Sequence, residues 1–93
     1  MLFRSVGDAA RLAAHPAVDL IVVNPPRKGC SPATLAAATA STAARLIYVS
    51  CGPEALGRDL ATLVGAGWRV DHAQPFDLMP ATSQIETVVR LVR

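Results

Sequence analysis

Residues 19–26 read Asp19-Leu-Ile-Val-Val-Asn-Pro-Pro26, a short apolar run that ends at two prolines. Strands that are covered by helices on both faces are continuously apolar, so the run predicts a central strand that is buried on both faces. Residues 45–53, Arg45-Leu-Ile-Tyr-Val-Ser-Cys-Gly-Pro53, repeat the pattern. We therefore expect two neighbouring buried strands, each followed by a loop that contains proline.

The segments that follow these strands have helical signals. Ser31 can act as an N-cap and Pro32 suits the first helical position, so a helix is predicted that continues to Ala44. Pro53 opens a second predicted helix, from Glu54 to about Val64. Its apolar positions on one face are Leu56, Leu60, Leu63 and Val64. Alternating strands and helices predict a parallel sheet with right-handed crossovers.

The two ends of the chain complete the predicted fold. Residues 68–77 and 84–92 are extended stretches, and the six residues between them cannot hold a crossover helix, so these stretches should pair antiparallel. At the front, residues 2–6 suggest a strand, and a short helix should end near Ala14. The expected fold class is α/β, with a mostly parallel sheet and an antiparallel last strand.

Length and composition limit the class of protein. Ninety-three residues suit a single domain, and 52% hydrophobic with 17% charged residues indicates a globular chain. The longest block of bulky aliphatic residues, Leu20 to Val23, is far shorter than a membrane span. Arg4, Asp8 and Arg11 interrupt the apolar stretch that a secretory signal would need. We expect a cytoplasmic protein.

Charge and cysteine content exclude further classes of site. A net charge of +2 with 4% aromatic residues gives no sign of a dense basic patch with stacking side chains for nucleic acid. Cys30 and Cys51 lack the CxxC spacing of a zinc site, so no metal is expected. In a reducing compartment both would be free thiols.

The predicted topology gathers polar side chains at one edge of the sheet. Ligands of open α/β sheets bind outside the carboxyl ends of the parallel strands. Asp8, residues 24–27 and residues 50–53 follow such ends, and the antiparallel last strand begins at the same edge with Glu86. Four segments with chemically capable side chains should therefore meet there.

Each of these side chains also has an ordinary structural explanation. Cysteine is often simply buried, but Cys51 stands directly before a helix whose N-terminal amides favour the thiolate. Glu86 could be an exposed carboxylate on a strand, or a general base if it is partly buried. Asp8 could cap a helix and Asn24 could cap a turn. Cys30 is expected to have no role beyond its loop.

Three separated motifs carry a family resemblance. Residues 24–29 (Asn-Pro-Pro-Arg-Lys-Gly), residues 48–60 (Tyr-Val-Ser-Cys-Gly-Pro, then Arg-Asp-Leu) and residues 76–86 (Phe-Asp-Leu-Met-Pro-Ala-Thr, then Ile-Glu) resemble the C-terminal half of the RNA 5-methyluridine (uracil-C5) methyltransferases. The motifs occur in the family's order. They extend, with Gly7-Asp8, to the end of the chain.

The resemblance implies a fold, a cofactor and roles for four residues. The family has a Rossmann-like domain that binds S-adenosylmethionine, and its substrate is RNA, either tRNA or rRNA. By resemblance, Cys51 is the nucleophile that attacks C6 of uracil and Glu86 is the base that removes the proton from C5. Asp8 and Asn24 would line the cofactor site. Asn24, Gly52 and Gln84 stand where the family usually has aspartate, asparagine and histidine.

The resemblance also implies that residues 1–93 are the C-terminal part of a methyltransferase catalytic domain. The chain lacks the family's Gly-rich loop, so by itself we expect weak cofactor binding at most and no activity. Without the family's first strands, the strand beginning at Leu20 should lack one neighbour, and an unpaired apolar edge favours self-association.

Two alternatives remain open at the level of the sequence. An inactive remnant, or half of a split enzyme, would act only by association. An amino-group methyltransferase also uses an Asn-Pro-Pro motif, but Arg27 stands where such enzymes have an aromatic residue, and Cys51 would then have no purpose.

Overall fold

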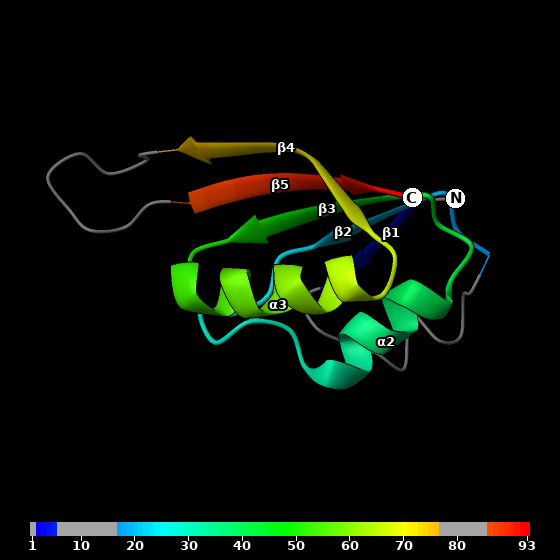
Figure 1. The fold of residues 1–93 in the computed structure, drawn as a ribbon, viewed down its shortest axis with the longest axis horizontal. Coiled ribbons are helices and arrows are strands. Elements are labelled where there is room, and N and C mark those ends of the chain that lie inside the picture. Colours follow the sequence, from blue (N-terminus) through cyan, green and yellow to red (C-terminus); the bar gives the residue numbers. More distant parts are fainter. Residues whose placement is uncertain (1, 6–16, 77–85) are drawn as a thin grey trace, which may run out of the picture.

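A computed structural model describes residues 2–5, 17–76 and 86–93 of the protein. It contains one five-stranded sheet with the order β1-β2-β3-β5-β4 and two helices (Figure 1). The elements are β1 (Leu2–Ser5), β2 (Leu20–Val23), α2 (Pro32–Ala40), β3 (Arg45–Ser50), α3 (Pro53–Gly65), β4 (Arg69–Phe76) and β5 (Glu86–Val92). The expected α/β class is confirmed. The helix expected to end near Ala14 lies outside the described residues.

The strand directions also agree with the prediction. β1, β2 and β3 are parallel, and β5 runs antiparallel between β3 and β4. Figure 1 shows β4 and β5 as a hairpin that extends past the ends of the other strands. The last strand thus lies beside the strand that ends just before Cys51.

The expectation that the Leu20 strand lacks a neighbour was wrong. β1 pairs with β2 in parallel, with Leu2 opposite Leu20, and β3 pairs with the other side of β2. Both edges of β2 therefore have hydrogen-bonded partners. Among the described strands, the sheet edges are β1 and β4.

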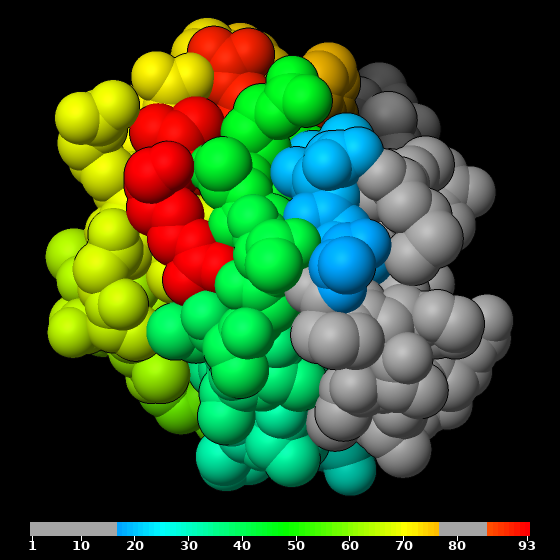
Figure 2. All heavy atoms as spheres, turned by 90° about the vertical axis from the view of Figure 1, so that its right-hand side faces the viewer, coloured from blue at the N-terminus to red at the C-terminus, as the bar shows by residue number. Residues whose placement is uncertain are grey.

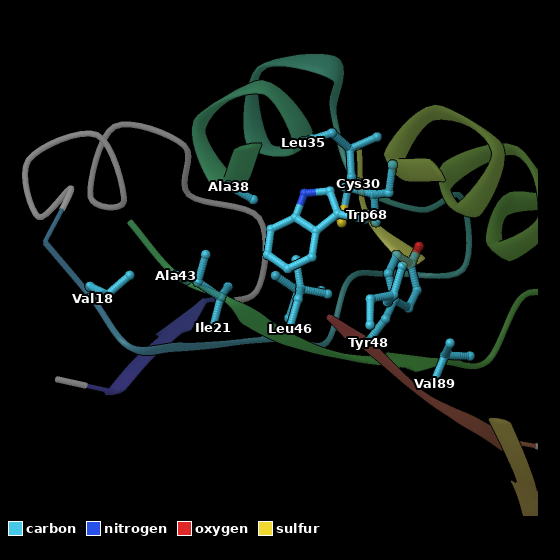
Figure 3. Close-up of a cluster of buried hydrophobic side chains, with 13 residues drawn as sticks. Val18, Ile21, Cys30, Leu35, Ala38, Ala43, Leu46, Tyr48, Trp68 and Val89 are labelled. Carbon is cyan, nitrogen blue, oxygen red and sulfur yellow. The ribbon is translucent and has the colours of Figure 1, made fainter. Parts of the chain in front are cut away.

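Burial on both faces was also a wrong expectation. Along β2 and β3 the buried residues alternate with partly buried ones, because α2 and α3 lie on the same face of the sheet (Figure 1). Trp68 lies between α2 and the sheet, and the Tyr48 oxygen points toward α3 (Figure 3). The core under the helices is built from Val18, Ile21, Val23, Cys30, Leu35, Ala38, Ala43, Leu46, Tyr48, Leu63, Trp68, Val89 and Leu91.

The first described helix is shorter than predicted. α2 ends at Ala40 rather than Ala44, because two hydroxyl side chains bond elsewhere. The Ser41 hydroxyl donates to the Ala38 carbonyl at 2.7 Å, and Thr42 bonds both backbone groups of Val18 at 2.9 Å. These bonds turn the chain out of the helix and into β3.

The second helix turns a slightly different face toward the core than predicted. Leu63 is fully buried and Leu56 and Leu60 pack against the core, but Val64 is 50% exposed. The buried positions of α3 are Ala55, Asp59 and Leu63, spaced four residues apart. A carboxylate therefore lies in the middle of the buried face. Neither of the two described helices is long and apolar enough to cross a membrane.

Arg93 ties the C-terminus to the end of α2. Its guanidinium donates hydrogen bonds to the carbonyls of Thr39, Ser41 and Ala43 at 2.7–2.8 Å, and it lies 4.1 Å from the centre of the Trp68 ring. Figure 2 shows the C-terminal residues, in red, against the green residues of the α2–β3 region. The last strand is thereby fixed to the helical layer.

Candidate active site

An open pocket of about 1290 Å³ lies at the carboxyl end of β3. Two segments form its walls: residues 26–28 in the loop after β2, and residues 50–55, which run from the end of β3 into the first turn of α3. Arg58 and Thr87 complete the lining. The pocket thus occupies the edge at which the topology predicted a binding site.

Cys51 lies in this pocket, in a short turn between β3 and α3. The Ser50 hydroxyl accepts from the Gly52 N–H and donates to the Gly52 carbonyl, each at 3.1 Å. α3 begins at Pro53, and the Leu56 N–H donates to the Gly52 carbonyl at 2.9 Å. Cys51 is half-buried and is a free thiol. The turn therefore presents a thiol to the pocket beside the N-terminus of a helix.

The register of the sheet puts Glu86 and Cys51 at the same end of the β3–β5 pair. The last paired residues are Ser50 of β3 and Thr87 of β5; Cys51 directly follows Ser50, and Glu86 directly precedes Thr87. Glu86 is half-buried but does not line the pocket. The carboxylate that does line it is the exposed Glu54, in the first turn of α3.

The other wall of the pocket is a tight turn that carries two cations. The Gly29 N–H donates to the Pro26 carbonyl at 2.8 Å, which places the exposed Arg27 and Lys28 at the tip. Gly29 has a φ of +89°, a conformation that side chains other than glycine rarely adopt. The turn therefore depends on glycine at this position.

Gly52 allows the two walls to touch. A Cβ atom at this position would overlap the backbone carbonyl oxygen of Arg27. The residue itself is buried and has an extended backbone with φ −123°. The departure from the family's usual asparagine at Gly52 therefore has a structural counterpart, which is direct backbone contact between the two loops.

A buried carboxylate in α3, for which the sequence predicted no function, connects the loop after β2 to β3. Asp59 is 1% exposed and accepts from the Cys30 N–H at 2.8 Å and from the Tyr48 hydroxyl at 2.5 Å. Arg58 donates from Nε to Asp59 at 3.3 Å and from Nη2 to the Lys28 carbonyl at 2.6 Å. One pattern in the sequence indicates that Asp59 is buried: it lies four residues from both Ala55 and Leu63, and therefore on the same face of the helix as these two apolar residues.

This network keeps its neighbours protonated. Burial, followed by the charge of Asp59, raises the pKa of the Cys30 thiol to about 11. Burial, followed by the hydrogen bond to Asp59, also raises the pKa of Tyr48. The thiolate is the nucleophilic form of cysteine, so Cys30 is no candidate nucleophile. The expectation that Cys30 belongs only to its loop agrees with this burial.

The residues expected at the cofactor site are only partly described. Asn24 is exposed directly after β2, with the buried Pro25 behind it, whereas Asp8 lies outside the described residues. Within residues 2–5, 17–76 and 86–93, no group of three or more His, Cys, Asp or Glu residues could hold a metal ion. Asn24 follows β2 and Cys51 follows β3, the neighbouring parallel strand, so both lie at the same edge of the sheet, but only Cys51 lines the pocket.

Comparison with known proteins connects these residues to one family. Residues 8–93 match the sequence profile of the family described as tRNA (uracil-5-)-methyltransferase. An RNA methyltransferase of Geobacter sulfurreducens is 42% identical over 92 residues, covering 94% of this chain and 19% of the relative. Another, from Gloeobacter violaceus, is 45% identical over 75 residues, covering 81% and 16%. The chain spans about a fifth of the length of these relatives.

Solved structures share the fold. The tRNA (uracil-54, C5)-methyltransferase of Pyrococcus abyssi, in complex with S-adenosyl-L-homocysteine, superposes with a TM-score of 0.75 at 32% identity, over 84% of this chain and 19% of that protein. The complex of M1.HpyAVI with SAM superposes with a TM-score of 0.65 at 14% identity, over 100% of this chain and 55% of that protein. The second likeness concerns the fold alone.

Proposed function

This chain belongs to the tRNA (uracil-5-)-methyltransferase family, and from that premise we propose that residues 1–93 are the C-terminal part of a catalytic domain that methylates C5 of uridine in RNA. The observation that carries the proposal is the position of Cys51, a half-buried free thiol that opens into a pocket at the carboxyl end of β3. The substrate is a uridine in tRNA or rRNA. A cytoplasmic location belongs to the same proposal, because Cys30 and Cys51 are free thiols.

The proposed chemistry gives Cys51 and Glu86 separate steps. The Cys51 thiolate adds to C6 of uracil, which makes C5 an enolate carbon that can accept a methyl group. After methylation, the Glu86 carboxylate removes the proton from C5, and the electron pair re-forms the C5–C6 double bond as the Cys51 sulfur leaves. The pairing of Ser50 with Thr87, the neighbours of Cys51 and Glu86 in the sequence, supports these paired roles.

S-adenosylmethionine, when bound, supplies the methyl group. Asn24 fits a contact with it, because its amide is exposed at the carboxyl end of β2 and can both donate and accept hydrogen bonds. We assign Asp8 to the same site by resemblance. Residues 2–5, 17–76 and 86–93 contain no glycine-rich loop of the kind that holds such cofactors.

The test uses a chimeric enzyme in which residues 8–93 replace the matching part of the Geobacter sulfurreducens relative. Cys51→Ala should abolish both methylation and covalent protein–RNA adducts, because C5 is then never activated. Glu86→Gln should allow attack and methyl transfer but block the elimination. It should therefore accumulate a gel-stable protein–RNA species with little released product.

Glu54→Gln is the matched control, since Glu54 is the carboxylate that lines the pocket beside Cys51. It should turn over and leave no trapped adduct. If the adduct accumulates in Glu54→Gln and not in Glu86→Gln, the base is Glu54. If Cys51→Ala still produces 5-methyluridine, the covalent mechanism is wrong. Melting curves by circular dichroism separate these outcomes from loss of folding.

A second candidate is a chain that acts only through association, as half of a split enzyme or as an inactive remnant. The observation that favours it is that Glu86 does not line the pocket that contains Cys51. A chimera that is folded, binds RNA and S-adenosylmethionine, and forms neither product nor adduct would support the remnant.

A further inference from the structure

The loop of residues 26–30 is held by four contacts, three with α3 and one with Gly52. Asp59 accepts from the Cys30 N–H, and Arg58 donates to the Lys28 carbonyl. Gly29 lies so close to α3 that a Cβ atom there would come 2.6 Å from Arg58 Nη2 and 2.7 Å from Asp59 Oδ2. The fourth contact is the one between the Arg27 carbonyl and Gly52. The loop therefore has little freedom to move away from the pocket.

These contacts determine where two cationic side chains lie relative to Cys51. Arg27 and Lys28 are at the tip of the loop, and they line the same pocket as Cys51. Among the described lining residues, Arg58 adds a third cation and Glu54 contributes one opposing charge. A pocket with an excess of positive charge attracts anions and orients them.

We propose that Asp59 and Arg58 are positioning residues, which hold the 26–30 loop against Gly52 so that Arg27 and Lys28 face an anion, a phosphate of the substrate strand, beside Cys51. The assignment of the anion rests on the proposed function. The positioning itself does not, because it concerns only the electric field at the Cys51 sulfur.

Burying the Asp59 carboxylate costs desolvation free energy, so a contribution to stability alone explains poorly why a carboxylate occupies this position. Its carboxylate is 1% exposed, and its strongest partners are a backbone N–H of the loop and a hydroxyl. A buried carboxylate is stabilised by such bonds but is rarely better than an apolar side chain of similar volume. The Asp59 carboxylate accepts a hydrogen bond from the Cys30 N–H, 29 residues away in the sequence. An apolar side chain of similar volume could fill the space but could not make this bond to the loop.

The test measures the charge preference of the Cys51 thiol in the 93-residue chain. Two methanethiosulfonate reagents are compared, one with an anionic sulfonate and one with a cationic trimethylammonium group. In each case the thiolate attacks the sulfenyl sulfur, forms a mixed disulfide and releases methanesulfinate. The rate at which each reagent labels the protein is divided by the rate at which the same reagent labels 2-mercaptoethanol, a small free thiol. Peptide mass mapping then assigns the label to Cys51 or Cys30. The anionic reagent should be favoured about fivefold at low salt.

Asp59→Asn distinguishes a role in holding the loop from a direct effect of the Asp59 charge, because the two predict opposite changes in the preference of Cys51 for the anionic reagent. Removing a negative charge would by itself increase the preference for the anionic reagent. If Asp59 holds the loop, the preference should instead fall at least about twofold, because the Arg58 contact is lost and the cations move away. Labelling of Cys30, now 5% exposed, should accelerate at the same time.

Asp71→Asn is the matched control, with the same change of charge on β4, where Asp71 pairs with Arg90 on the surface. In this variant, the ratio of anionic to cationic labelling rates at Cys51 should equal that of the wild type. Gly29→Ala keeps the proposal testable if Asp59→Asn fails to fold, because it displaces the loop without any change of charge. Gly29→Ala should also lower the preference of Cys51 for the anionic reagent.

An unchanged or increased preference in Asp59→Asn overturns the proposal, and so does an unchanged preference in a folded Gly29→Ala. Neither readout needs S-adenosylmethionine, RNA or methyl transfer. A failed methylation assay combined with the expected thiol preferences would therefore reject the proposed function and leave the positioning intact.

Discussion

Gly52 is the residue at which the two walls of the pocket meet. Its φ of −123° is open to any residue, so glycine is required here for space and not for conformation. The atom in the way is a backbone carbonyl oxygen of Arg27, which cannot rotate aside as a flexible side chain could. A single methyl group at Gly52 should therefore push the two loops apart.

Gly52→Ala is expected to lower the free energy of unfolding by about 1–3 kcal/mol, the usual cost of overpacking. Gly57→Ala is the matched control, because Gly57 lies inside α3 with no atom within 4 Å of a new Cβ. It should raise the same quantity by about 0.5–1 kcal/mol through helix propensity. Urea unfolding followed by Trp68 fluorescence measures both. Equal values would mean that the loops do not touch in solution.

At the scale of elements, one arginine connects the C-terminus to the end of α2. Arg93 donates to three carbonyl groups in the last turn of α2 and the turn that follows it, where the final carbonyls of a helix lack partners within the helix. It also covers the Trp68 ring, whose Nε1 donates to the Thr39 hydroxyl at 3.2 Å. α2, β4 and β5 therefore meet at this side chain.

Arg93→Met should lower the free energy of unfolding by about 1–3 kcal/mol, because charged hydrogen bonds and a cation–π contact are lost while the stem is kept. Arg90→Met is the control, since its ion pair with Asp71 lies on the surface at 52% and 37% side-chain exposure. Such pairs contribute about 0–1 kcal/mol. A loss at Arg90 as large as that at Arg93 in urea titrations would argue against the C-terminal connection.

On the scale of the whole molecule, β4 is the exposed edge of the sheet. All eight of its residues are exposed, including Val70 at 41% and Phe76 at 44%. An edge strand with unpaired backbone groups and apolar side chains favours pairing with another chain. We therefore expect self-association through β4, and not through β2 as the sequence indicated.

Val70→Lys should reduce the concentration dependence of the mass measured by light scattering, because a charge on an edge strand opposes pairing. Val64→Lys makes the same substitution on α3, at a valine that is 50% exposed, and should leave the association unchanged. A wild-type protein that remains monomeric at every concentration would contradict the prediction.

Cofactor binding also belongs to this scale. We expect the 93-residue chain to bind S-adenosylmethionine weakly or not at all in calorimetry, because backbone amides of a glycine-rich loop and a carboxylate for the ribose are needed to hold it. The chimera with the Geobacter sulfurreducens relative is expected to bind it more tightly than the 93-residue chain does. Micromolar binding by the 93-residue chain would show that Asn24 and its neighbours suffice.

The order of strands and helices, and the position of Cys51 at the sheet edge, could be predicted from the sequence. Local signals are enough for these features: β-branched runs form strands, and prolines mark where α2 and α3 begin. The family resemblance pointed to Glu86, and the pairing of Ser50 with Thr87 shows that it begins β5 at the end of the sheet where Cys51 follows β3.

Tertiary structure alone decided which faces are covered and how the pocket is held. The burial of Asp59, its bond to the Cys30 N–H 29 residues away, and the contact between Gly52 and Arg27 join segments that no local periodicity relates. The pairing of β1 with β2 is another case, because any apolar strand can satisfy a free parallel edge. Local propensity sets what each segment becomes, whereas packing and backbone hydrogen bonding between distant segments select its neighbours.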